Sequence, residues 1–298
     1  MKLIKNVVCV LVLGMLALPV CAGQVDWNVK METAMADLKA PATPEKPRKL
    51  LIYTMASGFV HSSIPIGAKC VEMMGKKTGA FEATTSNDPA VFDDLSKYDA
   101  VLMMSTTGNF LVPKEIGKMT PDEQKALKDK EPARRQAIVD FVKSGKGIAG
   151  IHAASDAYYA SWPEWGEIIG GYFNGHPFGK INVRIDDPKS PLNAQFNGEA
   201  FDFSDEIYTY KDPYSREKLH ILMSIDVEKS GITKGENRTD HDYAVAWIHE
   251  YGKGRVFYTL FGHREDTYAN PLTQKFFLAG LQYALGDLKA DATPSGKK

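Results

Sequence analysis

Gly145-Lys146-Gly147-Ile148-Ala149-Gly150-Ile151-His152-Ala153-Ala154-Ser155-Asp156 is the motif around which the rest of this chain is organised. An amphipathic segment leads into it, and the apolar run 147–151 has the length of a buried strand. In an α/β sheet, ligands bind at the carboxyl ends of central strands, so His152 is a candidate for chemistry. The alternative is that His152 only hydrogen-bonds a neighbouring loop.

Strand-like runs alternate with helix-like segments on both sides of this stretch. This spacing predicts an α/β fold whose sheet is mostly parallel and connected by right-handed crossovers. After residue 180 the strands follow one another and the chain becomes β-rich. Expected strands are 49–54, 81–86, 98–104, 147–151, 181–185, 201–210, 219–225, 243–249 and 255–261. Expected helices are 62–76, 87–95, 121–130, 133–144, 164–169 and 271–285.

The first 22 residues differ in character from the rest. Lys2 and Lys5 precede an apolar run, 7–20, and Val20-Cys21-Ala22 resembles a small-residue cleavage site. This pattern predicts a signal peptide and a secreted or periplasmic protein; the run is too short for a confident membrane span. A lipoprotein anchor at Cys21 is the lesser alternative.

The remaining chain divides into three parts. The proline-rich segment 23–48 is expected to be an N-terminal arm, 49–286 a single domain and 287–298 a flexible tail. Removal of residues 1–22 leaves Cys70 unpaired, so the mature chain has no disulfide framework.

Composition narrows the class of partner. The chain has 298 residues, 24% charged side chains and a formal net charge of −1. This balance gives no reason to expect nucleic acid or an anionic membrane as partner and suits a small neutral ligand. The first expected strand is not followed by a Gly-x-Gly-x-x-Gly loop, which argues against a nucleotide cofactor. The oligomeric state is left open.

Three further histidines stand in turns beside expected strands. His61 precedes the first long helix, His176 follows a glycine-rich turn, and His263 follows the last strand. We expect these three and His152 to meet at one edge of the sheet. The alternative is that each satisfies a buried backbone group.

Two other stretches carry candidate binding residues. Tyr158 and Trp162 lie in a segment whose aromatic rings suit sugar faces, although a hydrophobic cluster explains them equally well. Strand alternation over 205–208 places Glu206 and Tyr208 on one face and Asp205 on the other.

Several of these motifs together resemble the ThuA-like (trehalose utilisation) family. They are 150–156 (GIHAASD), 171–177 (GYFNGHP), 205–208 (DEIY) and 252–263 (GKGRVFYTLFGH), in the family's order, and the likeness covers about residues 49–286. The resemblance implies a flavodoxin-like sheet with helices on both faces, of the class I glutamine amidotransferase-like superfamily. It also implies a link to disaccharide or keto-sugar metabolism.

The likeness to glutamine amidotransferases does not extend to the reaction that those enzymes catalyse. Residues 150–154 look like the turn that holds the catalytic cysteine in those enzymes, with His152 in the cysteine position, and His263-Arg264-Glu265 looks like their His-x-Glu pair. A thioester needs a thiolate, and Cys70 lies in the first long helix. The scaffold is therefore similar and the chemistry must differ.

We expect an enzyme that acts on a sugar or keto-sugar by hydrolysis, isomerisation or elimination. His152 and His263, together with Asp156, Glu206 or Glu265, could bind Zn²⁺ or another divalent ion, or the same groups could transfer protons without metal. The alternatives are a non-catalytic sugar-binding protein and a metal-dependent amide hydrolase. The expected catalytic residues are His152, His263, Glu265 and Asp156, and the expected substrate-binding residues are His61, Tyr158, Trp162, His176, Glu206, Tyr208 and Arg264.

Overall fold

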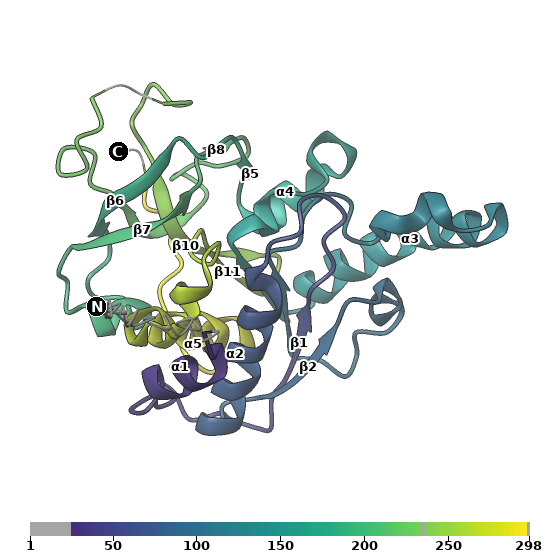
Figure 1. Ribbon diagram of the computed structural model, residues 1–298, viewed down its shortest axis with the longest axis horizontal. Helices are drawn as coiled ribbons and strands as arrows, with labels where there is room; N and C mark the ends of the chain where they lie inside the picture. Colours follow the sequence, from purple (N-terminus) through teal and green to yellow (C-terminus); the bar gives the residue numbers. More distant parts are fainter. Residues whose placement is uncertain (1–24, 234–235, 297–298) are drawn as a thin grey trace, which may run out of the picture.

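The computed structural model describes residues 25–233 and 236–296 (Figure 1). The predicted signal peptide, 1–22, lies outside the described residues. Within them, no helix is both long and apolar enough to cross a membrane.

One nine-stranded sheet runs through the molecule in the order β2-β1-β3-β4-β11-β10-β9-β6-β7. The first five strands in this order are parallel and follow the flavodoxin-like 2-1-3-4-5 pattern, whereas the other four are antiparallel. The predicted fold class and the β-rich C-terminal portion are thus confirmed. The strands are β1 (Lys49–Tyr53), β2 (Glu82–Ser86), β3 (Ala100–Met104), β4 (Gly147–Ile151), β6 (Phe178–Ile185), β7 (Phe201–Ile207), β9 (His220–Ile225), β10 (Ala244–Tyr251) and β11 (Gly254–Thr259), with β5 (Tyr172–Phe173) and β8 (Tyr210–Lys211) forming a separate pair.

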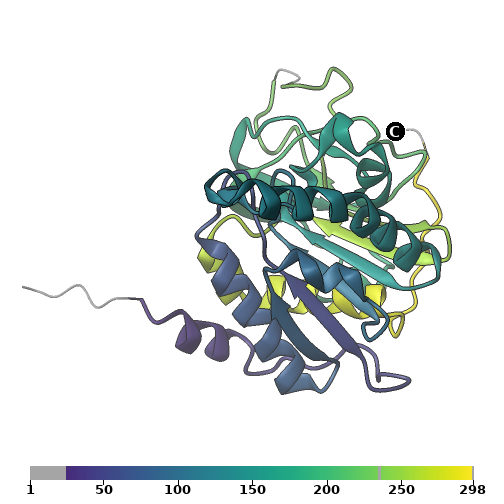
Figure 2. The same cartoon turned by 90° about the vertical axis from the view of Figure 1, so that its right-hand side faces the viewer.

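Helices cover both faces of the sheet. Helices α2 (Ser63–Thr78) and α5 (Pro271–Leu285) lie on one face, and α3 (Pro121–Lys143) and α4 (Pro163–Ile169) lie on the other (Figures 1 and 2). Short 3-10 turns fill the connections: η1 (Pro89–Asp93), η2 (Lys114–Lys118), η3 (His152–Ser155), η4 (Tyr159–Ser161), η5 (Pro191–Phe196) and η6 (Glu265–Ala269).

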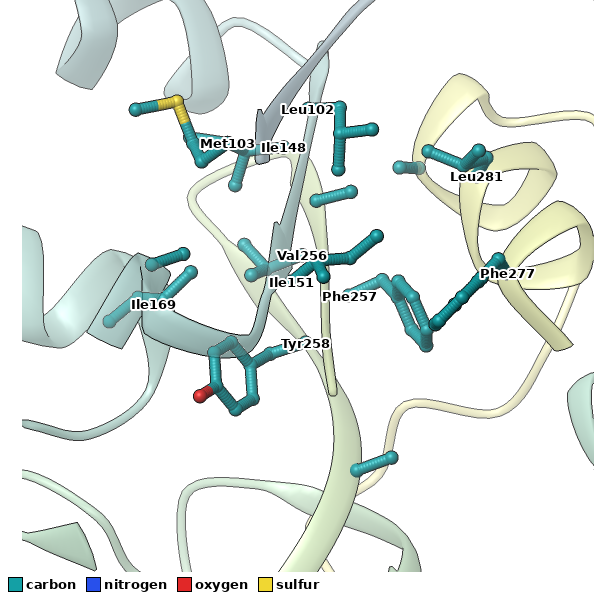
Figure 3. Packing of buried hydrophobic residues seen from close by; sticks show 14 of the residues in the cluster. Leu102, Met103, Ile148, Ile151, Ile169, Val256, Phe257, Tyr258, Phe277 and Leu281 are labelled. Atoms are coloured by element: carbon teal, nitrogen blue, oxygen red, sulfur yellow. The ribbon is translucent and has the colours of Figure 1, made fainter. Parts of the chain in front are cut away.

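Side chains of the central strands point alternately to the two faces of the sheet, and both faces are buried. Phe257 faces α5 and its neighbour Tyr258 faces α4 (Figure 3). Strand β4 passes so close to α5 that a Cβ on Gly147 would lie 1.9 Å from the carbonyl oxygen of Ala284. Glycine at this position therefore lets the strand that carries His152 sit at the centre of the core.

The sequence-based division of residues 121–144 into two helices is wrong. The structure has one helix of 23 residues, α3, with Pro132 inside it and a capping box between Thr120 and Glu123 at its start. The second half is anchored by buried residues such as Ile138 and Val142, and the first half projects from the body (Figure 1). One proline removes one backbone donor, which the capped and anchored helix tolerates.

Both terminal segments contact the domain where they are described. In the arm, α1 (Trp27–Ala34) buries Met31, and the Gln274 side chain donates to the Met31 carbonyl at 3.1 Å. In 287–298, expected to be a flexible tail, the backbone N–H of Ser295 donates to the carbonyl of Leu219 at 3.0 Å.

Candidate functional site

Three histidines meet at the carboxyl edge of the parallel strands. His61 lies in the loop between β1 and α2, His152 follows β4 directly, and His263 follows β11. Glu206 reaches the same place from β7, because the antiparallel part of the sheet turns back until the Phe203 ring packs 4.1 Å from that of Phe261. The structure therefore brings together three of the four histidines that were expected at this edge, whereas His176 is not part of this group.

The ligand atoms of His61, His152, Glu206 and His263 all lie within 4.8 Å of one another. We call these four residues the His3Glu cluster. The Nε2 atoms of His61 and His152 are 3.2 Å apart, and Glu206 Oε2 lies 3.3 Å from His152 Nε2 and 3.2 Å from His263 Nδ1. Glu206 Oε2 is thus the point that the three rings share.

His152 is the most constrained member of the cluster. It is fully buried and has a φ of 48°, a backbone conformation that only tight surroundings maintain in a non-glycine residue. Its Nδ1 lies 2.9 Å from the carbonyl oxygen of Leu260, which can only accept, so Nδ1 carries the proton. Burial lowers the pKa of His152, so the ring is neutral and Nε2 presents a lone pair to the cluster.

Glu206 supplies the negative charge. Burial by itself raises the pKa of its carboxyl, but the neighbouring imidazoles of His152, His61 and His263 outweigh this and hold the pKa well below its usual range. The carboxylate is therefore ionised at neutral pH. Its other oxygen, Oε1, lies 3.5 Å from Nε2 of His176, which is more than half exposed.

The donor set fits a divalent transition metal. A tetrahedral Zn²⁺ site with Zn–N bonds of about 2.0–2.1 Å separates its ligand atoms by about 3.3 Å, close to the three shortest distances in the cluster. His263 Nδ1 is buried and makes no hydrogen bond although it lies 3.2 Å from Glu206 Oε2. A buried nitrogen that faces the other ligand atoms and has no hydrogen-bond partner is what a metal site requires. The Nδ1–H bond of His152 to a backbone carbonyl is the usual outer support of a metal-binding histidine.

Asp205 supports the cluster, a role that the sequence did not suggest. Its two carboxylate oxygens accept hydrogen bonds from the backbone N–H groups of Gly262 and Arg264, both at 3.1 Å. Asp205 and Glu206 thus contact different parts of the same loop, Asp205 its backbone and Glu206 the ring of His263. Asp205 therefore fixes the residues on either side of His263 while Glu206 joins the cluster.

Tyr208 and Asp156 adjoin the cluster. Tyr208 directly follows β7, and the centroid of its ring lies 4.4 Å from that of His152. Burial raises the pKa of Asp156, and its carboxylate accepts a hydrogen bond from the Tyr159 hydroxyl.

Two expected site residues, Glu265 and Arg264, are paired with residues outside the His3Glu cluster. Glu265 accepts a hydrogen bond at 2.5 Å from Ser62, and Arg264 is exposed and paired with Asp266 at 2.7 Å. The resemblance to a His-x-Glu pair predicted that Glu265 lies beside the histidines. In the structure Glu206 lies there instead.

Tyr158 and Trp162 form part of the core. Both are buried, with the Tyr158 ring 4.9 Å from Phe110 and 5.0 Å from Trp162, and the guanidinium of Arg135 lies over both. Rings buried in this way have no free face for a sugar, so the hydrophobic-cluster alternative describes them better. The exposed aromatic side chain beside the cluster is Phe59, which the sequence analysis did not single out.

Comparison with known proteins agrees with this architecture. A family model described as trehalose utilisation, ThuA, matches residues 49–284. A ThuA-like protein from Bacteroides uniformis is 18% identical with a TM-score of 0.60, covering 81% of this chain and 93% of its own. One from Parabacteroides merdae is 20% identical with a TM-score of 0.57, covering 83% and 93%. The search of curated proteins found no match. Because the family model spans most of the chain, the protein belongs to the ThuA-like family.

Proposed function

We propose that this protein is an enzyme that acts on a sugar or keto-sugar related to trehalose, at a divalent metal ion held by the His3Glu cluster. The family indicates a carbohydrate-related role. The observation that carries the proposal is the convergence of three imidazoles and one ionised carboxylate within 4.8 Å. Such a set is costly to bury together unless something binds it.

His61, His152, Glu206 and His263 would hold the metal. When bound, Zn²⁺ supplies a Lewis acid that polarises a carbonyl oxygen or lowers the pKa of water. The buried His152 and His61 form the inner wall, whereas Glu206 and His263 are partly exposed and lie on the side from which a ligand can approach.

The protein's own groups also provide proton transfer. His176 faces solvent beside Glu206, and Asp156 lies near the cluster with a raised pKa. A positioned acid or base contributes about 10²–10⁴-fold to a rate. These groups suit two classes of reaction. One begins with removal of a proton next to a ketone and leads to isomerisation or elimination, and the other is hydrolysis.

The test combines metal analysis with turnover. The purified protein is loaded with Zn²⁺, Mn²⁺ or Ni²⁺, its metal content is measured, and it is assayed with trehalose and 3-ketotrehalose. We expect about one ion per chain and turnover that is lost in His152→Ala and His263→Ala.

The matched control is His220→Ala, because His220 is paired with Asp187 and the Thr293 carbonyl, away from the cluster. Unchanged turnover in both cluster variants would refute the proposal. Tight sugar binding with no product would favour the non-catalytic binding protein instead.

A further inference from the structure

Phe59 and Val60 are large apolar side chains exposed beside a polar cluster. They are 65% and 56% exposed. In the described part of the chain the other large exposed hydrophobic residues are Val25, Val29 and Leu272, so Phe59 is the one aromatic ring among them. An exposed apolar pair is informative when it adjoins a site, because single exposed residues elsewhere need no explanation.

The backbone under these side chains is fixed. The N–H of Ser57 donates to the Thr107 carbonyl at 2.9 Å, and the Thr107 hydroxyl donates to the Phe59 carbonyl at 2.8 Å. The Lys114 ammonium donates to the Gly58 carbonyl at 3.2 Å. A Cβ on Gly108 would lie 2.8 Å from the Gly58 nitrogen, so the two loops also pack closely. The exposure of Phe59 is therefore a property of a well-anchored loop.

The ring is in direct contact with the His3Glu cluster. Its centroid lies 4.7 Å from that of His61 with the planes 75° apart, and His61 Nε2 lies 3.2 Å from His152 Nε2. A ligand that packs on Phe59 would thus lie next to His61, which is a member of the cluster. The site joins a flat apolar surface to a set of groups that bind oxygen.

We propose that Phe59 is the stacking platform for the sugar ring of the substrate, an inference that rests on the proposed function. A pyranose has an apolar C–H face and a polar edge, so its face can pack on Phe59 while its hydroxyl or keto oxygens point to the cluster. Burial of the exposed ring supplies affinity without taking part in proton transfer. Phe59 is thus a binding residue that selects ligands with a flat apolar face.

The test uses Phe59→Ala and the ring-preserving Phe59→Trp in the metal-loaded full chain. Calorimetry measures the Kd of trehalose and 3-ketotrehalose, kinetics separates KM from kcat, and metal content is measured in parallel. We expect Phe59→Ala to weaken binding and raise KM about tenfold, with kcat and metal content nearly unchanged, and Phe59→Trp to bind as the wild type does. Val29→Ala is the matched control, because it removes an equally exposed apolar side chain from α1.

The outcomes separate this inference from the function on which it rests. If His152→Ala abolishes turnover but Phe59→Ala binds sugar as the wild type does, the platform is refuted and the proposed function stands. A large loss of metal in Phe59→Ala would show that the residue supports the cluster rather than the ligand. If the wild type binds neither sugar, both proposals fail.

Discussion

His152 and His249 are both buried histidines, but their ring nitrogens face different kinds of partner. In His249 both ring nitrogens face backbone carbonyls, with Nε2 2.8 Å from Ile168 and Nδ1 3.2 Å from Glu250. In His152 one nitrogen faces a carbonyl and the other faces His61 and Glu206. Burial alone therefore does not mark a functional histidine; the marker is a nitrogen that the backbone leaves for other side chains.

The largest expected effect comes from exchanging the two histidines for alanine. His152→Ala should weaken Zn²⁺ binding by at least about 100-fold, because a ligand is lost and even an outer-shell partner is typically worth 10–100-fold. His249→Ala should keep the metal and lower the free energy of unfolding by about 1–3 kcal/mol, since a buried backbone carbonyl loses its donor. Competition with a chromogenic chelator and urea unfolding measure the two effects. Equal loss of metal in both variants would show that His152 has no special role in metal binding.

Glu206→Gln tests the charge at the centre of the cluster. The amide keeps the shape but removes the negative charge that the three histidines share, so metal affinity should fall roughly 10–100-fold. Glu199→Gln is the control, because Glu199 is exposed and lies outside the cluster. Full metal affinity in Glu206→Gln would mean that the histidines bind the ion without the carboxylate.

Asp205→Asn tests a residue that acts on the cluster through the backbone on either side of His263. The substitution replaces one oxygen that accepts from the loop around His263 with an amide nitrogen, so the loop loses a fixed position. We expect metal affinity to fall about tenfold. In Asp205→Glu the metal affinity should recover only if the longer carboxylate accepts hydrogen bonds from both N–H groups. A loss of stability with unchanged metal affinity would assign Asp205 to the fold alone.

The smallest effect is the pH dependence of stability due to His249. Burial lowers its pKa in the folded protein despite the opposing hydrogen bonds, whereas in the unfolded chain the pKa is about 6.5. Below that pH the unfolded chain binds a proton that the folded protein does not, so stability falls as pH falls, by at most about 1.4 kcal/mol per unit. Urea unfolding of the metal-free protein between about pH 5 and 7.5 should show a smaller slope for His249→Gln. An unchanged slope would show that His249 does not titrate on unfolding.

Much of the fold could be predicted because its signals are local. The apolar runs that became β1, β4 and β11 and the helical pattern of α5 stand out within a few residues, and α5 and β4 have the predicted bounds. The break predicted before Ala133 was wrong because Pro132 is a strong local stop signal that the packing of α3 overrides.

The site was only partly predictable. His61, His152 and His263 follow parallel strands, so chain order and the parallel pattern together placed them at one edge. Trp162 and Phe59 could not be ranked from sequence, because an aromatic residue in a loop carries the same local signal whether its ring is buried or exposed.

Local patterns in the sequence specify the alternation of strands and helices, the position of His152 after a central strand and the resemblance to a family. The contact of Glu206, rather than Glu265, with the three histidines arises only in the folded chain. The reason is that β7 lies four strands from β11 in the sheet and reaches His263 only because the sheet turns back and Asp205 ties it to that loop. Such a contact depends on the path of the whole sheet, which no local pattern of residues encodes.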